Sequence, residues 1–156
     1  MITVSPRPAK RNWFTLSFAS TLYLCPVLDL LLAEIPEKCQ AEVRLGLQEA
    51  LVNAAKHGNQ LDPGKTIMVQ FSVFKNQLWW IISDQGGGFR PPQRCGSPPS
   101  ESNKVSDKAS EFDEIPNIER ECGRGLYILN QIFDKVEWNY YGTELSLCKE
   151  LTEAYA

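Results

Sequence analysis

The sequence has a single histidine, His57, and no two of its cysteines form a C-x-x-C pair. One histidine excludes metal sites built from several histidines, and it makes any Ser-His-Asp hydrolase depend on that one residue. The five cysteines are odd in number, so neither a disulfide framework nor a zinc site is indicated. Free cysteines are typical of a reducing compartment, and we expect a cytoplasmic protein.

An excess of basic charge is also missing. Lys and Arg number 16 against 19 Asp and Glu, giving a formal net charge of −3. No overall basic field attracts nucleic acid, so we expect no direct nucleic-acid partner. The sequence also lacks the G-x-x-x-x-G-K-[ST] phosphate loop and the H-R-D and D-F-G motifs. P-loop NTPases and eukaryotic-type protein kinases are therefore excluded.

No uninterrupted apolar run is long enough to cross a membrane. The run at 13–32 follows a basic lead-in and superficially resembles a secretory signal. Apolar and polar residues alternate over 14–18, as they do in strands, and Pro26 and Asp29 interrupt the remainder. We therefore expect a strand followed by a helix, and no membrane partner.

The length of 156 residues and the apolar share of 43% fit a single globular domain, 1–156. Short polar turns join two pairs of strands, which must then be antiparallel neighbours. We expect an α+β fold: a two-layer sandwich with helices on one face of a mixed, mostly antiparallel sheet. Apolar periodicity predicts strands at about 12–19, 66–74, 78–83, 136–140 and 143–148, and helices at about 25–35, 37–57 and 124–133.

The segment 90–122 differs from the rest of the chain. It is rich in Pro, Ser, Glu and Lys and has no apolar period. A stretch of this size inside a compact domain is usually a lid, a binding loop or a disordered segment. Of these three we favour a mobile lid.

The stretch 45–58, LGLQEALVNAAKHG, is the most informative part of the sequence. Its apolar residues recur at helical spacing, and Glu49 and Asn53 are four residues apart, so they share one helix face. Lys56 and His57 extend that face. Carboxylate and amide oxygens suit Mg²⁺, and an ammonium group suits phosphate. The alternative interpretation is an ordinary solvated helix face.

A second motif, Asp84-x-Gly86-x-Gly88, comes directly after an expected strand. Glycines let the backbone approach a ligand closely, because they have no Cβ. A carboxylate at a strand end can accept a hydrogen bond from an exocyclic amine such as adenine N6, and it would repel the carbonyl oxygen of guanine. The alternative is a plain Asp-Gly turn.

A third motif, Gly123-Arg124-Gly125-Leu126, opens the last expected helix. Glycines at a helix start expose free N–H groups at the positive end of the helix dipole, which suits a phosphate group. The alternative is an ordinary glycine turn before an amphipathic helix.

The motifs E-x-x-x-N-A-x-x-H-G, D-x-G-x-G-F, G-x-G-L and a final G-T occur together and in this order. As a set they resemble the GHKL ATP-binding family, whose members include gyrase and histidine kinases. The resemblance covers a core of about 12–149. It is closest to the stand-alone bacterial anti-sigma factor serine/threonine kinases, through QEALVNAAKHGN, SDQGGGF, GRGLYILNQIFDKVEW and GTELSLCK. The segment 90–122 is longer and more polar than in compact relatives.

The resemblance implies a role for each motif residue. Glu49 would be the general base toward water or a substrate hydroxyl, and Asn53 a ligand of Mg²⁺. Asp84 would read adenine, and Thr143 would lie near the adenine-bound water. The remaining implied roles are pocket shape for Gly86 and Gly88, and phosphate contact or lid hinge for Lys56, Gly123, Arg124, Gly125 and Leu126.

The implied function is a serine/threonine kinase that binds ATP and Mg²⁺, phosphorylates a STAS-type anti-anti-sigma protein and sequesters a sigma factor. Relatives of this kind are often dimers, so the resemblance also implies a homodimer. Histidine kinases need a phosphoacceptor histidine outside the ATP domain, and we interpret His57 as a structural residue at the helix end. Two alternatives stay open: a non-catalytic ATP-dependent protein-binding module, and a histidine-kinase-like catalytic domain acting in trans.

Overall fold

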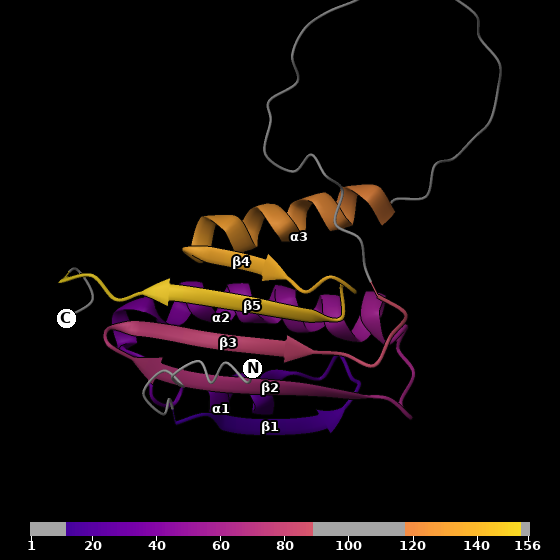
Figure 1. Cartoon of the computed structure of the whole chain (residues 1–156), viewed down its shortest axis with the longest axis horizontal. Helices are drawn as coiled ribbons and strands as arrows, with labels where there is room; N and C mark the ends of the chain where they lie inside the picture. Colours follow the sequence, from indigo (N-terminus) through magenta and orange to yellow (C-terminus); the bar gives the residue numbers. More distant parts are fainter. Residues whose placement is uncertain (1–11, 89–117, 154–156) are drawn as a thin grey trace, which may run out of the picture.

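The computed structural model describes residues 12–88 and 118–153, and of 118–123 it describes the backbone alone (Figure 1). The expected lid at 90–122 lies outside the described residues, except for its last part, which forms the beginning of a helix. Among the described residues, no helix combines the length and the apolar character needed to cross a membrane. The elements in chain order are β1 Phe14–Ala19, α1 Cys25–Leu32, α2 Glu37–Asn53, the π-helical turn η1 Ala54–Gly58, β2 Thr66–Phe74, β3 Gln77–Ser83, α3 Ile118–Ile132, β4 Lys135–Trp138 and β5 Glu144–Glu150.

The described strands form one five-stranded sheet in the order β1-β2-β3-β5-β4. Each neighbouring pair is antiparallel, so the sheet we expected to be mixed is antiparallel throughout its described strands. The connection from β3 to β4 skips a position, because β5 returns to lie between them. The last residue of β3, Ser83, therefore pairs with the first residue of β5, Glu144.

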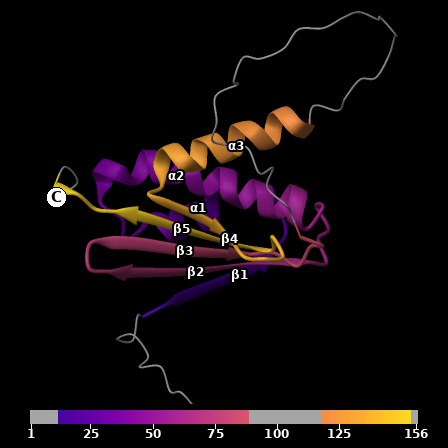
Figure 2. The same ribbon diagram turned by 45° about the horizontal axis from the view of Figure 1, so that its top comes forward.

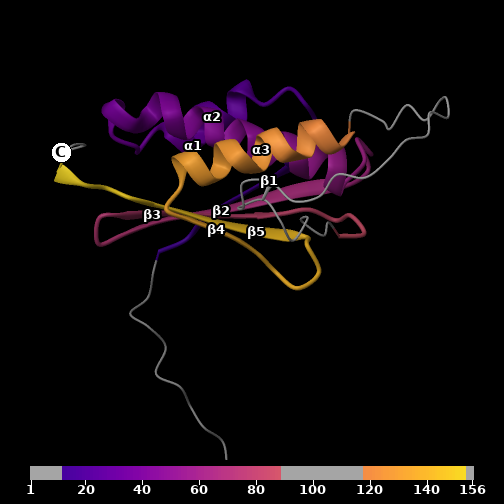
Figure 3. The same cartoon turned by 90° about the horizontal axis from the view of Figure 1, so that it is seen from above.

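The three helices lie together on one side of the sheet (Figure 3). Seen obliquely, α3 runs alongside α2 (Figure 2). This arrangement confirms the expected two-layer α+β sandwich. The core lies between the layers and includes fully buried side chains from both, among them Val43, Leu47, Leu51, Ile67, Val69, Leu78, Trp80, Leu129, Leu145 and Leu147.

Strand alternation decides which side chains reach this core. In β2, Ile67, Val69 and Phe71 are buried, as the period-two pattern predicts. Val73 continues the same alternation and was expected on the same face, but it is 49% exposed. Burial depends on the helical layer above the strand as well as on the alternation, and at Val73 that cover is incomplete.

Two helices differ from their expected bounds. Helix α1 ends at Leu32, short of 35; Pro36 disfavours helical dihedrals at Ile35, the last residue of the expected range. Helix α3 begins at Ile118, so Gly123 and Gly125 lie inside it and do not open it. A glycine inside a helix costs only about 1 kcal/mol relative to alanine, so glycine pairs do not by themselves begin or end a helix.

Candidate functional site

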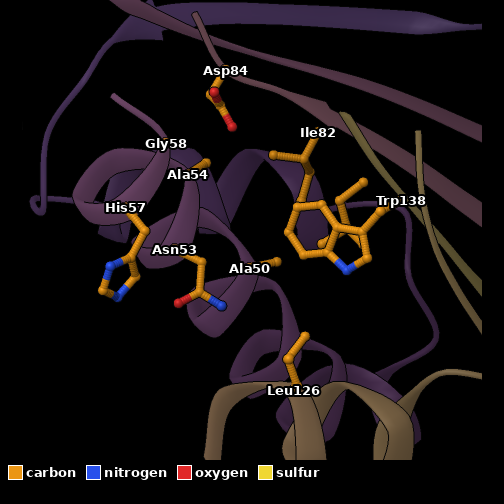
Figure 4. A pocket seen from close by; sticks show the side chains of 10 residues that line it. Ala50, Asn53, Ala54, His57, Gly58, Ile82, Asp84, Leu126 and Trp138 are labelled. Carbon is orange, nitrogen blue, oxygen red and sulfur yellow. The ribbon is translucent and has the colours of Figure 1, made fainter. Parts of the chain in front are cut away.

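A pocket opens between the helical layer and the sheet, beside the end of β3 (Figure 4). Its empty space is about 450 Å³, including the part open to solvent. Ile82 and Trp138 lie on its sheet side, and Ala50 and Ala54 on its helix side. The small alanines leave a narrow apolar slot. The other lining residues are Asn53, His57, Gly58, Asp84, Leu126 and Leu145.

Asp84 supplies the carboxyl group at one end of the slot, and Figure 4 shows it directed toward the pocket. It follows directly after β3, and its Oδ1 accepts a hydrogen bond from the Gly86 N–H at 2.8 Å. Burial raises the pKa of Asp84 above its ordinary value, while the hydrogen bond from Gly86 and the charge of Lys65 lower it. A half-buried carboxyl group held in this way can accept a hydrogen bond from a ligand N–H.

Close backbone packing around Asp84 requires glycine at three positions. A Cβ on Gly58 would overlap the carboxyl group of Asp84, and a Cβ on Gly86 would overlap the carbonyl of Gly58. Gly88 has a φ of +95°, and its Cβ would overlap the carbonyl of Tyr141. The D-x-G-x-G motif thus predicted two positions of close approach. The contact of Gly58 with Asp84 became visible only in the fold.

Asn59 is a residue that the sequence reasoning missed. It is fully buried, its Nδ2 donates to the Thr66 carbonyl at 3.0 Å, and its Oδ1 accepts from the Gln85 N–H at 2.8 Å. Gln85 Oε1 in turn accepts from the Thr66 N–H at 2.9 Å. These bonds tie the end of η1 to the loop that carries Asp84. The only sequence signal was its place at the end of the KHGN segment.

The last turn of the central helix is π-helical over Ala54–Gly58, where a regular helix was expected. The turn is closed by a hydrogen bond from the Asn59 N–H to the Ala54 carbonyl at 2.8 Å. Such turns are frequent at functional sites, because they redirect side chains. Here His57 lines the pocket, while Lys56 is exposed and is not among the lining residues.

Glu49 and Asn53 come together where α3 packs against α2. A Cβ built on Gly125 would lie 3.3 Å from Asn53 Nδ2 and 3.5 Å from Glu49 Oε2. The buried backbone of Gly125 therefore packs against the polar ends of both side chains. Glu49 and Asn53 thus share a helix face, as predicted, and form one cluster with the backbone of Gly125.

The amide of Asn53 fits a magnesium ion that is held mainly by the phosphates of a bound nucleotide. Mg²⁺ bound with phosphates takes one or two protein oxygens and keeps several waters. The amide oxygen of Asn53 can be one of these oxygens, and the carboxylate of Glu49 lies in the same cluster. Among the side chains that the structure describes, in 12–88 and 124–153, no group of three or more His, Cys, Asp or Glu could hold a metal ion.

The third motif is only partly at the pocket. Leu126 lines it, whereas Arg124 is exposed. The sequence predicted that Gly123 would stand at a helix start. It lies within α3 instead, so its amide is not one of the free N–H groups of a helix start. The expected anion site at the N-terminus of this helix is therefore not formed at 123–125 in this structure.

Thr143 lies beside Asp84, although it does not line the pocket. Its carbonyl accepts a hydrogen bond from the Asp84 N–H at 3.0 Å. Its own N–H donates to Asn139 Oδ1 at 2.9 Å, and its Oγ1 accepts from Asn139 Nδ2 at 3.2 Å. Thr143 therefore connects the loop after β4 to the loop after β3.

Residues 26–149 match the model of the histidine kinase-like ATPase domain. The chain is similar to the serine-protein kinase RsbW of Bacillus licheniformis, with 28% identity over 96 residues, covering 61% of this chain and 54% of the relative. For RsbW of Bacillus subtilis (strain 168) the identity is 27% over 113 residues, covering 70% and 64%. For RsbW of Oceanobacillus iheyensis it is 22% over 115 residues, covering 72% and 66%.

The chain thus spans about half to two thirds of the length of these curated relatives. The domain model, in contrast, covers most of this chain, and an ATPase domain implies nucleotide binding. With its antiparallel sheet, its helical layer and the pocket between them, the chain belongs to the histidine kinase-like ATPase family.

Proposed function

We propose that this protein is a serine/threonine kinase that binds ATP and Mg²⁺, phosphorylates a STAS-type anti-anti-sigma protein and sequesters a sigma factor. The observation that carries the proposal is the pocket itself. The carboxyl group of Asp84 and the amide of Asn53 line one apolar slot, and the carboxylate of Glu49 lies with Asn53 against Gly125. The similarity to serine-protein kinases supports the reaction type.

The apolar slot would take the adenine ring, and Asp84 would accept a hydrogen bond from its exocyclic amine. Gly86 and Gly88 would keep the loop close enough for that contact. Guanine presents a carbonyl oxygen at this position, and two facing acceptors cost about 1–3 kcal/mol. Thr143 would hold Asp84 in place through the backbone hydrogen bond between them.

The phosphates would extend toward Glu49 and Asn53. Asn53 would offer its amide oxygen to Mg²⁺, and the ion would neutralise phosphate charge. Lys56 and Arg124 would supply cationic contacts. Gly123, Gly125 and Leu126 would form the hinge of the lid, after α3 has moved away from the Glu49–Asn53 pair.

Glu49 would accept the proton of a serine hydroxyl on the partner protein. The serine oxygen then forms a bond to the terminal phosphorus while the bond from that phosphorus to the bridging oxygen breaks. ADP leaves with the bonding electrons. The sigma factor, the homodimer and the cytoplasmic location rest on the family resemblance.

The deciding experiment incubates the protein with ATP labelled at the terminal phosphate and a STAS-type protein from the same host. Acid-stable label on a partner serine supports the kinase. Acid-labile label favours a histidine-kinase-like domain acting in trans, and ATP binding without transfer favours a non-catalytic binding module. Pull-down with and without ATP identifies the sequestered factor.

A further inference from the structure

We infer that Trp138 is the residue that stacks on the nucleotide base and favours purine over pyrimidine triphosphates. The inference rests on the proposed function, since it assigns a contact within the same pocket. Trp138 is the last residue of the stretch GRGLYILNQIFDKVEW, but it lies outside the four short motifs, and no role of its own was predicted for it from the sequence.

Trp138 is well placed for this contact. It is the last residue of β4, it pairs with Leu145 of β5, and both line the pocket. Figure 4 shows its indole next to Ile82 on the sheet side, with Ala50 on the helix side. A base read by Asp84 at one end of the slot would extend past Ile82 toward this indole. An aromatic ring gives a base a stacking surface that an aliphatic side chain cannot give.

The position of Trp138 is fixed by the turn that follows it. Asn139 N–H donates to the Glu144 carbonyl at 2.9 Å, and Asn139 Oδ1 accepts from the N–H groups of Thr143 and Glu144. Thr143 then accepts from the N–H of Asp84 through its carbonyl. One chain of hydrogen bonds therefore links the neighbour of Trp138 to Asp84. The two residues are held at a set separation before any ligand arrives, which limits the ordering cost of binding.

Stacking favours purines because two fused rings cover more of an indole than one ring does. Asp84 alone would not make this distinction, because cytosine also carries an exocyclic amine. The two residues would thus have separate tasks. Asp84 would distinguish amine from carbonyl, and Trp138 would distinguish ring size.

The test compares Trp138→Phe and Trp138→Leu with the control Trp79→Phe in the full chain. Trp79 lies on β3 between Leu78 and Trp80, whose side chains enter the core, so it is on the sheet face without helices. Calorimetry gives the affinity for ATP and CTP in the presence of Mg²⁺, and tryptophan fluorescence follows each titration. Thermal unfolding confirms that each variant is folded.

We expect ATP to change the fluorescence of the wild type and of Trp79→Phe, and to leave Trp138→Phe unchanged. Trp138→Leu should bind ATP roughly 10-fold more weakly, the scale of one base–aromatic contact, with a smaller loss for CTP. Wild-type ATP affinity in Trp138→Leu, or a fluorescence change on adding ATP to Trp138→Phe as large as that of the wild type, overturns the inference and leaves the proposed function standing. Failure of the wild type to bind ATP overturns both.

Discussion

Gly86→Ala is the most direct perturbation of the loop that carries Asp84. The new Cβ would overlap the backbone carbonyl of Gly58 and lie 3.0 Å from Asp84 Oδ1. A backbone carbonyl cannot rotate away as a flexible side chain can, so the loop must shift. Overpacking of this kind costs about 1–3 kcal/mol. The shift also weakens the 2.8 Å hydrogen bond from the Gly86 N–H to Asp84, so ATP affinity should fall by about 1.4 kcal/mol, or 10-fold.

The neighbouring glycine provides the control. A Cβ on Gly87 would meet nothing within 4 Å. Gly87→Ala should therefore change stability by less than about 0.5 kcal/mol and leave ATP affinity intact. Urea unfolding and calorimetric titration with ATP measure both quantities. If Gly86→Ala and Gly87→Ala behave alike in the two assays, the packing argument for the Asp84 loop is wrong.

Three further predictions concern individual charged groups. Glu49→Gln should retain ATP binding and lose phosphoryl transfer by a factor of about 10² or more; transfer at the wild-type rate would show that Glu49 is not the base. Burial raises the pKa of Asp84, so its carboxyl group holds a proton more tightly in the folded state than in the unfolded chain. The stability of the fold therefore falls as pH rises from about 4 through the raised pKa. Asp84→Asn should remove that dependence, so thermal unfolding should show the variant gaining stability relative to the wild type between about pH 4 and 7, while its ATP affinity falls. Parallel pH profiles for the two proteins would contradict this prediction. Lys149 is 5% exposed and binds both Glu42 Oε1 and the Ile132 carbonyl at 2.9 Å. Because the Glu42 side chain is 39% exposed, Lys149→Met should lower the free energy of unfolding by only about 1–3 kcal/mol, and adding Glu42→Gln should restore part of that loss in denaturant unfolding. Equal stability of the wild type and Lys149→Met would refute the prediction.

The architecture was largely predictable from periodicity. Alternation specified β2 and most of its buried face, the apolar run at 78–83 specified β3, and the three-residue polar stretch between them specified a hairpin. The start of α3 was not predictable, because the glycine pair in 123–125 carries the same sequence signal at a helix start as inside a helix. Only packing against α2, where Gly125 meets the Glu49–Asn53 pair, distinguishes the two cases.

The candidate site was predictable where its residues form a recurring motif. Asp84, Asn53 and Leu126 line one pocket although they come from distant parts of the chain. Lys56 was grouped with His57 from the helical period, and the π-helical turn then left His57 lining the pocket and Lys56 exposed beside it. A change of period within a helix depends on tertiary hydrogen bonds, so periodicity cannot predict it.

The sequence by itself determined which segments form strands and helices, most of the buried face of β2, and the set of polar residues available for nucleotide chemistry, because these depend on local spacing and residue type. Tertiary structure alone decided that Gly58 must lack a side chain beside Asp84, that Asn59 joins η1 to the Asp84 loop, and that Trp138 lines the pocket. Each of these depends on contacts between segments far apart in the chain. Such contacts are set by how the helical layer packs on the sheet.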